Sequence, residues 1–461
     1  MLLFPILILA QTDYPKLNYE INNGNFSEAN KIIDIYLDDP RLSEDQKDLL
    51  KFEQERLERI KKDFKLTQTD VLDYIKKFIP EANENMLYKW ESDGSLEIKV
   101  INGEKKYFNR SHTNLFRINK EAKERKEAIT LETKDGLDLL LENLVPQILS
   151  DIDSGYGMPQ KIKLKYTITV EKNIVPPGAT LRCWIPYPRE GNERQNIVEF
   201  HTDDKSIIAD NNNLQRSIYF EKKVEKDTPT KFSYELVLLN KAYISNINKD
   251  LIKPYQKDSD LFIEYTSERK PHIVFTDKIK SLSKNIIGNE TNPFLKAKLI
   301  FEWISNNIPW AGAREYSTIE NISDYCLTNM HGDCGIKTLL FMTLARYNGI
   351  PTKWQSGWML HPGEKNLHDW CEAYFEGYGW VPVDQSFGII DSDNESVKYF
   401  YLGNIDQYRF IVNDDYSKPF YPTKNFPRSE TVDFQRGEVE WEGGNLYFDK
   451  WDYSMEIEYL D

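Results

Sequence analysis

The chain has 461 residues, of which 40% are hydrophobic and 13% aromatic, so it carries enough apolar side chains for several globular domains. Its net charge of −15 and its pI near 5.1 argue against nucleic acid and anionic membrane surfaces as partners, because both attract basic proteins. No run of about 18 apolar residues is present, so the sequence predicts no transmembrane helix.

Residues 1–10 form the most apolar run of the chain, and polar sequence begins at Gln11. The run resembles the hydrophobic region of a signal peptide cut after Ala10, although no basic segment precedes it. We therefore expect a signal peptide over residues 1–10 and an exported protein, whether periplasmic, on the cell surface or secreted. A buried N-terminal strand is the alternative interpretation.

Residues 11–155 are predicted to form a mostly helical region with one small β-hairpin. A helical hairpin occupies the stretch up to about Lys65, with Ser43 capping its second helix. It resembles a single tetratricopeptide-like unit, without a visible second copy. Asn102-Gly103 is typical of a tight turn between two strands. The cluster of glycine and proline that ends at Pro159 predicts a domain boundary.

Residues 160–268 alternate apolar and polar side chains, which predicts a β-sandwich-like domain. The next segment, residues 272–390, contains a predicted helix around Ala297 to Ile304 and all the motifs described below. Residues 391–461 are aromatic and acidic, and we expect this extension to pack on the core. The sequence thus predicts an α+β, multidomain chain.

Cys334 lies at the start of a predicted helix that runs from Ile336 to Tyr347. Apolar residues recur along this helix every fourth position, so we expect it to be largely buried. Free backbone N–H groups and the helix dipole favour a thiolate at such a position. The neighbouring glycines, Gly332 and Gly335, allow other backbone to approach closely.

A predicted hairpin follows, with His368 on its first strand and Asp384 at the end of its second. Strand register decides whether the two side chains can meet. A three-residue loop, Glu376 to Tyr378, or a one-residue bulge sets Asp384 opposite Trp370, with His368 as its diagonal neighbour on the same face. A two- or four-residue turn would point His368 to the other face. We expect the odd loop or the bulge.

Cys334, His368 and Asp384 therefore have the order of a thiol triad, in which His activates the sulfur and Asp fixes the tautomer. The four motifs around them resemble the core of the transglutaminase-like superfamily. They are Gly332-Asp333-Cys334, Gly349-Ile350-Pro351, His368-Asp369-Trp370-Cys371-Glu372 and Gly379-Trp380-Val381-Pro382-Val383-Asp384. The resemblance implies a papain-like α+β core over residues 272–390, with these three residues as nucleophile, base and orienter. The β module before it resembles that of some bacterial members.

Other residues of this segment have less specific interpretations. Cys371 is the second candidate nucleophile, but its place within a strand favours a core role. The backbone N–H of Cys334 is the first candidate oxyanion donor. Trp310, Tyr316 and Gln355 are candidates for the second donor, and Trp310 resembles the tryptophan that animal transglutaminases use. His331 is a candidate substrate contact or an exposed loop residue.

The sequence predicts a cysteine-dependent enzyme that acts on amide bonds of a peptide or glycopeptide, the substrate class that the resemblance implies. Hydrolysis is the first interpretation, because no calcium loop or amine-acceptor site is recognisable. A protein-crosslinking acyltransferase and a non-catalytic binding or scaffold module are the alternatives. No metal or cofactor is predicted. With Cys334 as a free thiol, the four cysteines allow at most one disulfide.

Overall fold

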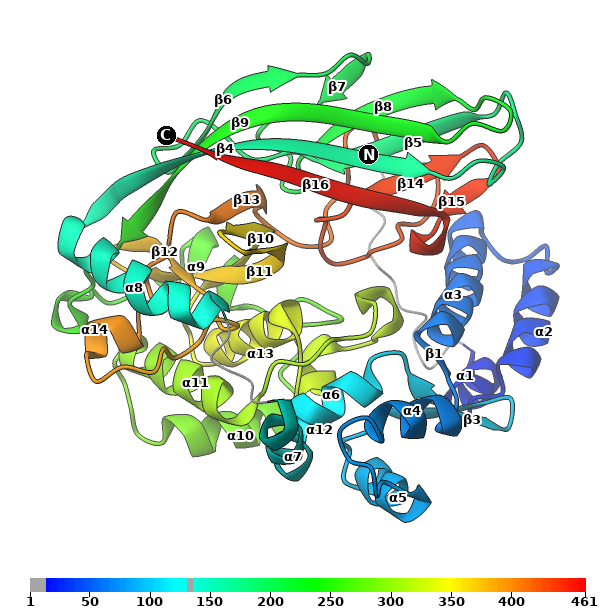
Figure 1. Ribbon diagram of the computed structural model, residues 1–461, viewed down its shortest axis with the longest axis horizontal. Helices are drawn as coiled ribbons and strands as arrows, with labels where there is room; N and C mark the ends of the chain where they lie inside the picture. Colours follow the sequence, from blue (N-terminus) through cyan, green and yellow to red (C-terminus); the bar gives the residue numbers. More distant parts are fainter. Residues whose placement is uncertain (1–13, 131–135) are drawn as a thin grey trace. The chain divides into compact units, whose positions relative to one another are not determined.

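The computed structural model describes residues 14–130 and 136–461 (Figure 1). The predicted signal peptide, residues 1–10, lies outside the described residues. The described chain divides into two compact units. The first contains residues 14–130, 270–272 and 308–333, and the second contains residues 136–269, 273–307 and 334–461.

The first unit begins with the predicted helices, which continue as a helical array around a small antiparallel sheet. Ser43 caps α3 as predicted, because its side chain accepts from the backbone of Gln46 in a capping box. The predicted turn at Asn102-Gly103 joins β2 to β3, and β1 adds a third strand that sequence analysis missed. The elements are α1 (Pro15–Asn22), α2 (Phe26–Leu37), α3 (Glu44–Asp63), β1 (Phe64–Leu66), α4 (Gln68–Ile75), α5 (Glu84–Ser92), β2 (Ile98–Ile101), β3 (Glu104–Phe108), α6 (Ser111–Ile118) and α7 (Lys120–Thr130).

A segment from the middle of the chain, residues 308–333 with α12 (Ile322–Asn329), belongs to this first unit. Asn114 and Gly312 exchange two hydrogen bonds of 2.8 and 3.0 Å between side-chain amide and backbone. The hydroxyl of Thr318 donates to a carboxylate oxygen of Asp63 at 3.1 Å. These contacts tie the segment that ends just before Cys334 to the N-terminal helices.

The second unit contains a five-stranded sheet and two four-stranded sheets. The five-stranded sheet has the order β15-β14-β5-β8-β7, and one four-stranded sheet has the order β16-β4-β9-β6. Phe220 of the first and Phe232 of the second are 6.2 Å apart between ring centroids, so the two sheets face each other in the predicted sandwich-like manner. The strands are β4 (Gly155–Val170), β5 (Thr180–Pro186), β6 (Gln195–His201), β7 (Ser206–Ile208), β8 (Ser217–Lys223), β9 (Thr230–Ile244), β14 (Glu438–Trp441), β15 (Gly444–Leu446) and β16 (Trp451–Leu460).

The other four-stranded sheet, β12-β11-β10-β13, carries the motifs of the predicted core. Helix α13 packs on its strands β10 and β11, and its residues 335–346 are all buried, as the apolar pattern predicted. The turn between β10 and β11 is tight, because β10 extends to His361 and β11 begins at Glu364. The strands are β10 (Thr352–His361), β11 (Glu364–Phe375), β12 (Gly379–Val383) and β13 (Arg409–Asn413).

Helices and the C-terminal segment complete this unit. The C-terminal segment, which we expected on the core, supplies strands to all three sheets of the unit (Figure 1). Residues 260–266, at the end of the segment that we expected to be β, form helix α9, and the side chain of Ser259 caps this helix. None of the four cysteines forms a disulfide. Within the described residues, no helix is long and apolar enough to cross a membrane. The helices are α8 (Gly136–Asp151), α9 (Asp260–Thr266), α10 (Asp277–Ile287), α11 (Pro293–Asn307), α13 (Cys334–Tyr347) and α14 (Glu395–Lys398).

Gly357 of β10 allows β13 to approach closely, and its substitution tests this contact. It pairs with His368 on one side and with Ile411 on the other. A Cβ atom at this position would lie 2.0 Å from the carbonyl oxygen of Phe410. We expect Gly357→Ala to lower the free energy of unfolding by roughly 1–3 kcal/mol, the usual cost of overpacking, as measured by urea denaturation.

Gly136→Ala is the matched control for this substitution. Apart from its chain neighbours, no atom of the described residues lies within 4 Å of a Cβ built at Gly136, which starts α8. The stability of Gly136→Ala should therefore stay close to that of the wild type. Equal changes in unfolding free energy for Gly357→Ala and Gly136→Ala would show that the packing of β13 on β10 does not depend on the close approach at Gly357.

Candidate active site

Cys334 is the first residue of the buried helix α13. Its side chain is partly exposed, whereas the other three cysteines are buried. Gly349, with φ at +74°, ends the helix at the predicted place and returns the chain toward β10. The local sequence therefore places a partly accessible thiol at the positive end of a helix held in the core.

The hairpin of β11 and β12 has the register that we predicted. Phe375 pairs with Gly379, which leaves the three-residue loop Glu376 to Tyr378, and Cys371 pairs with Val383. Continuing this register sets Asp384 opposite Trp370. His368 is then the diagonal neighbour of Asp384 on the same face.

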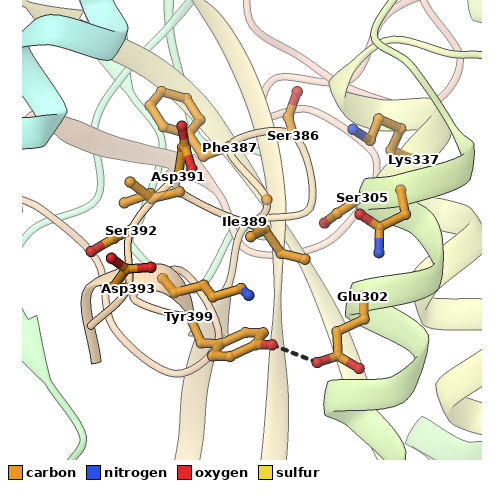
Figure 2. A pocket seen from close by; sticks show the side chains of 14 residues that line it. Glu302, Ser305, Lys337, Ser386, Phe387, Ile389, Asp391, Ser392, Asp393 and Tyr399 are labelled. Atoms are coloured by element: carbon orange, nitrogen blue, oxygen red, sulfur yellow. Dashed lines mark hydrogen bonds between the residues drawn. The ribbon is translucent and has the colours of Figure 1, made fainter. Parts of the chain in front are cut away.

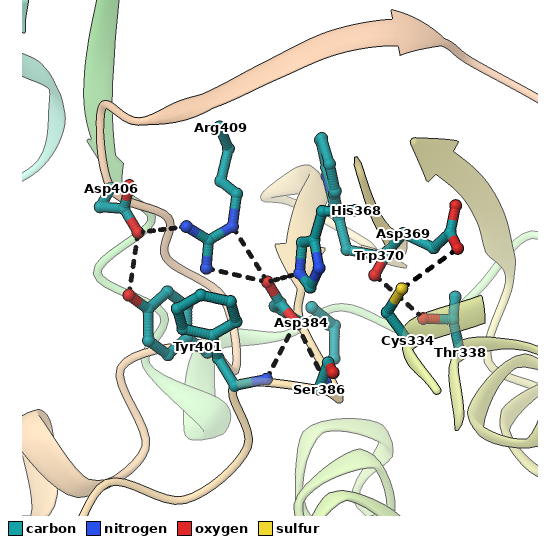
Figure 3. A network of polar contacts seen from close by, with 12 residues as sticks. Cys334, Thr338, His368, Asp369, Trp370, Asp384, Ser386, Tyr401, Asp406 and Arg409 are labelled. Atoms are coloured by element: carbon teal, nitrogen blue, oxygen red, sulfur yellow. Dashed lines mark hydrogen bonds and ion pairs between the residues drawn. The ribbon is translucent and has the colours of Figure 1, made fainter. Parts of the chain in front are cut away.

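His368 and Asp384 contact each other, with His368 Nε2 2.8 Å from Asp384 Oδ2 (Figure 3). The other carboxylate oxygen of Asp384 accepts from the backbone N–H groups of Ser386 and Phe387 at 3.1 and 3.2 Å. Both partners are almost fully buried. Burial alone would raise the pKa of Asp384, but His368 and then Arg409 lower it from 3.8 to about 2. Asp384 is therefore a carboxylate that orients an imidazole.

Arg409, a residue that sequence analysis missed, holds this carboxylate from the other side. It is fully buried on β13, and two of its nitrogens donate to Asp384 Oδ2 at 3.2 Å. Its third nitrogen donates to Asp406 at 3.0 Å, and Asp406 also accepts from the hydroxyl of Tyr401 at 2.8 Å. Burial alone would lower the pKa of Arg409, but Asp406 and Asp384 raise it, so the guanidinium stays charged.

His361 completes this buried network. His361 Nε2 lies 2.8 Å from Arg409 Nη1 and 3.2 Å from Asp406 Oδ1. Burial is the largest effect on His361 and lowers its pKa below 6.5, which favours a neutral ring. No sequence signal marked His361, Asp406 or Arg409 as a group, because they come together only when β13 pairs with β10.

The thiol of Cys334 has a partner that sequence analysis did not consider. Its Sγ donates to Asp369 Oδ2 at 3.3 Å, and Asp369 is the residue after His368 (Figure 3). The other oxygen of Asp369 accepts from Gln435 Nε2 at 2.7 Å, and the same amide donates to the carbonyl oxygen of His368 at 2.6 Å. Gln435, from the C-terminal segment, thus fixes both Asp369 and the backbone at His368.

Gln355 and Cys371, two other candidates in the second unit, both lie in environments typical of residues that stabilise the fold. Gln355 accepts from Trp370 Nε1 at 2.9 Å and donates to Asp414 at 3.0 Å, so both ends of its amide are engaged. This arrangement gives no support to Gln355 as an oxyanion donor. Cys371 is fully buried on β11, and burial raises the pKa of its thiol well above the ordinary value. Its environment is that of a core residue.

The remaining candidates, Trp310, Tyr316 and His331, belong to the first unit. The guanidinium of Arg117 lies 4.6 Å from the ring centroid of Trp310. The hydroxyl of Tyr316 donates to Asp333 at 2.7 Å. His331 is buried rather than exposed in a loop, and desolvation lowers its pKa to about 4, so it is neutral. The roles of these three residues stay predictions.

Within the described residues, no group of three or more His, Cys, Asp or Glu side chains is arranged to hold a metal ion. The site contains a partly exposed thiol with the carboxylate of Asp369 beside its sulfur, and an imidazole oriented by the buried carboxylate of Asp384. Such a set can supply a sulfur nucleophile and move a proton.

Comparison with known families agrees with this geometry. Residues 280–385, a segment that includes Cys334, His368 and Asp384, match the family model of the transglutaminase-like superfamily. The chain contains a transglutaminase-like core. The transglutaminase-like core that the four motifs predicted is therefore confirmed over residues 280–385.

Other proteins that resemble the chain do so at low sequence identity and over part of its length. An uncharacterized protein of Haemophilus influenzae is 24% identical over 279 residues, which cover 50% of this chain and 73% of that protein. A candidate cysteine protease from Cytophaga hutchinsonii is 16% identical over 66% of this chain and 92% of that structure, with a TM-score of 0.45. The periplasmic domain of TgpA from Pseudomonas aeruginosa is 12% identical over 49% of this chain and 88% of that structure, with a TM-score of 0.25.

Substitution of Arg409 tests the buried network of the transglutaminase-like core. Arg409→Leu leaves Asp384 and Asp406 buried without their shared cation, so we expect a loss of roughly 3–5 kcal/mol of unfolding free energy at pH 7. The pKa of Asp384 lies below its ordinary value, so the ion pair stabilises the fold above pH 4. This contribution is lost as the pH falls toward 2. Urea denaturation at pH 7 and at lower pH should show that the difference in unfolding free energy between variant and wild type becomes smaller as the pH falls.

Lys163→Gln is the control, because it removes one partner of a surface ion pair with Glu235 at 3.4 Å. Its effect should be about 1 kcal/mol or less. An Arg409 variant as stable as this control at pH 7 would show that the network does not hold the core together.

Asp369→Asn tests the contact of the thiol. A carboxylate 3.3 Å from the sulfur disfavours the thiolate, and asparagine removes the charge while keeping an acceptor for Gln435. We expect Cys334 to react with iodoacetamide roughly three- to tenfold faster at pH 7, with its pH profile shifted to lower pH. Slower alkylation at every pH would instead show that Asp369 holds the sulfur in a reactive position.

Proposed function

We propose that this protein is an exported cysteine-dependent enzyme that hydrolyses amide bonds of a peptide or glycopeptide through an acyl-enzyme. Cys334 is the nucleophile, His368 the base and Asp384 the orienter of the imidazole. The observation that carries the proposal is the 2.8 Å contact between His368 Nε2 and Asp384, on a hairpin packed against the helix that begins at Cys334.

The contact with Asp384 supports an assignment of the two imidazole nitrogens. Asp384 engages Nε2, so in the proposed reaction Nδ1 exchanges a proton with Cys334. In Figure 3 the ring of His368 lies between the carboxylate of Asp384 and the side on which Cys334 stands. The thiol proton, which points to Asp369 in this arrangement, must turn to His368 Nδ1 for attack.

The proposed cycle has two displacements. Cys334 gives its proton to His368 Nδ1, and the thiolate attacks the amide carbon, with the backbone N–H of Cys334 as one donor to the oxyanion. The imidazolium then protonates the leaving amine, the C–N bond breaks and a thioester forms. Water attacks the thioester while giving a proton to His368, the C–S bond breaks, and the imidazolium reprotonates the sulfur.

A charged Asp384 supports this cycle in two ways. It keeps the proton of the neutral imidazole on Nε2, and it stabilises the imidazolium when Nδ1 is protonated. Arg409 supports the same charge, because it favours the ionised form of Asp384 at all pH values above about 2. A positioning role of Arg409 follows from this proposal.

Alkylation by iodoacetamide, mapped by peptide mass spectrometry, tests the proposed nucleophile. We expect Cys334 to react near neutral pH, and to slow by roughly tenfold or more in His368→Ala, because the thiolate loses its imidazolium partner. Cys183 and Cys371 serve as internal references, since burial raises the pKa of both thiols well above the ordinary value. Equal rates at Cys334 and at the references would support a scaffold module without turnover.

Assays with peptide amides, in the presence and absence of a primary amine, then distinguish hydrolysis from crosslinking. Release of the carboxylic acid product with and without the amine supports hydrolysis, and accumulation of the amine adduct supports crosslinking. Cys334→Ser is the inactive control in each assay.

A further inference from the structure

The ring of Phe387 covers the buried charges that orient His368. Its centroid lies 3.6 Å from the central guanidinium carbon of Arg409 and 5.2 Å from the centroid of the His368 ring. The nitrogens of Arg409 donate along the edge of the guanidinium, to Asp384 and Asp406, so the face of the group has no hydrogen bond to lose. An aromatic ring on this face therefore excludes water and leaves the hydrogen bonds intact.

The turn after Asp384 brings this ring close to the carboxylate. The backbone N–H of Phe387 donates to Asp384 Oδ1 at 3.2 Å, and the backbone N–H of Gly388 donates to the carbonyl oxygen of Asp384 at 3.1 Å. Gly388 has a φ of +57°, a conformation that favours glycine. The backbone that satisfies the carboxylate therefore also fixes the position from which the ring of Phe387 reaches Arg409.

Phe387 also lines a cavity of about 710 Å³ (Figure 2). Glu302 and Lys398 are among its charged lining residues, so the cavity is polar enough to admit water. Phe387 is partly exposed, whereas Asp384 and Arg409 are fully buried and do not line the cavity. The ring of Phe387 thus lies between the water-accessible cavity and the two buried charges.

Exclusion of water from these charges affects the imidazole. His368 Nε2 lies 2.8 Å from Asp384 Oδ2, and the attraction of the carboxylate for an imidazolium weakens as the effective dielectric constant rises. Loss of the ring of Phe387 would also hydrate His368, which favours its charged form. Trp370, which is fully buried, still lies 5.9 Å from the imidazole between ring centroids, so hydration of His368 would be partial. The weaker attraction to Asp384 is therefore the larger effect.

We propose that Phe387 is a positioning residue of this site, whose ring keeps water from Asp384 and Arg409 and so holds the imidazole of His368 in the orientation that serves Cys334. The inference rests on the proposed function, because that function makes His368 the base. Phe387 acts through Asp384 and His368, and the proposal gives it no contact with the substrate.

Truncation of the ring tests this role. We expect Phe387→Ala to slow the alkylation of Cys334 by iodoacetamide roughly three- to tenfold at pH 7 and to shift its pH profile to higher pH, because a less firmly oriented imidazole stabilises less thiolate. Phe387→Tyr keeps the ring and should keep the wild-type profile. Diethyl pyrocarbonate, which modifies imidazole nitrogens, should react faster with His368 in Phe387→Ala than in the wild type, as mapped by peptide mass spectrometry.

Tyr399→Ala is the matched control. Tyr399 lines the same cavity, and its hydroxyl donates to Glu302 at 2.6 Å, so its truncation enlarges the cavity at another wall. Its alkylation profile should match that of the wild type. An unshifted profile in Phe387→Ala, slower alkylation without a shift, or an equal shift in Tyr399→Ala would overturn the inference and leave the proposed function standing. An alkylation rate unchanged by His368→Ala would overturn the proposed function and, with it, the role of Phe387.

Urea denaturation shows whether Phe387→Ala is folded under the conditions of the assay. If it is not, Phe387→Leu takes its place, since leucine keeps an apolar side chain but is smaller than the ring and not planar. Part of the guanidinium face of Arg409 is then uncovered, and we expect a smaller shift of the pH profile in the same direction. A profile of folded Phe387→Leu identical to that of the wild type would overturn the inference.

Discussion

The buried carboxylate of Asp384 is the constraint on which the site depends. A charge without solvent needs partners, and Asp384 has a histidine on one side, a guanidinium on the other and two backbone N–H groups below. Each partner comes from a different part of the core sheet or the chain that follows it. The strands β11, β12 and β13 must therefore all be in place before the imidazole has a fixed orientation.

The C-terminal segment, residues 391–461, supplies side chains that this arrangement needs. It supplies Arg409, which holds Asp384, and Gln435, which fixes Asp369 and the backbone of His368. The close approach of β13 to β10 at Gly357 is what brings Arg409 to the carboxylate. The segment also contributes β14, β15 and β16 to the two other sheets of the unit, so the site and the sandwich are parts of one packed structure.

Two opposing electrostatic influences act on the thiol. The helix N-terminus favours an anion at the sulfur, whereas the carboxylate of Asp369 accepts a hydrogen bond from the thiol and favours its neutral form. In this arrangement the thiol is held by Asp369, and its partner in the proposed chemistry, His368, is the preceding residue of the same strand.

The sequence determined the helix that carries Cys334, the three-residue loop of the hairpin and the pairing of His368 with Asp384. These features depend on local patterns, namely an apolar period, turn glycines and the alternation of a strand, so neighbouring residues suffice to predict them. The contacts of Arg409, Asp406, His361 and Gln435 could not be predicted in this way, and neither could the contact between Cys334 and Asp369. They join residues from different elements, and only the order of strands in the sheet and the packing of the helix bring such residues within hydrogen-bond distance.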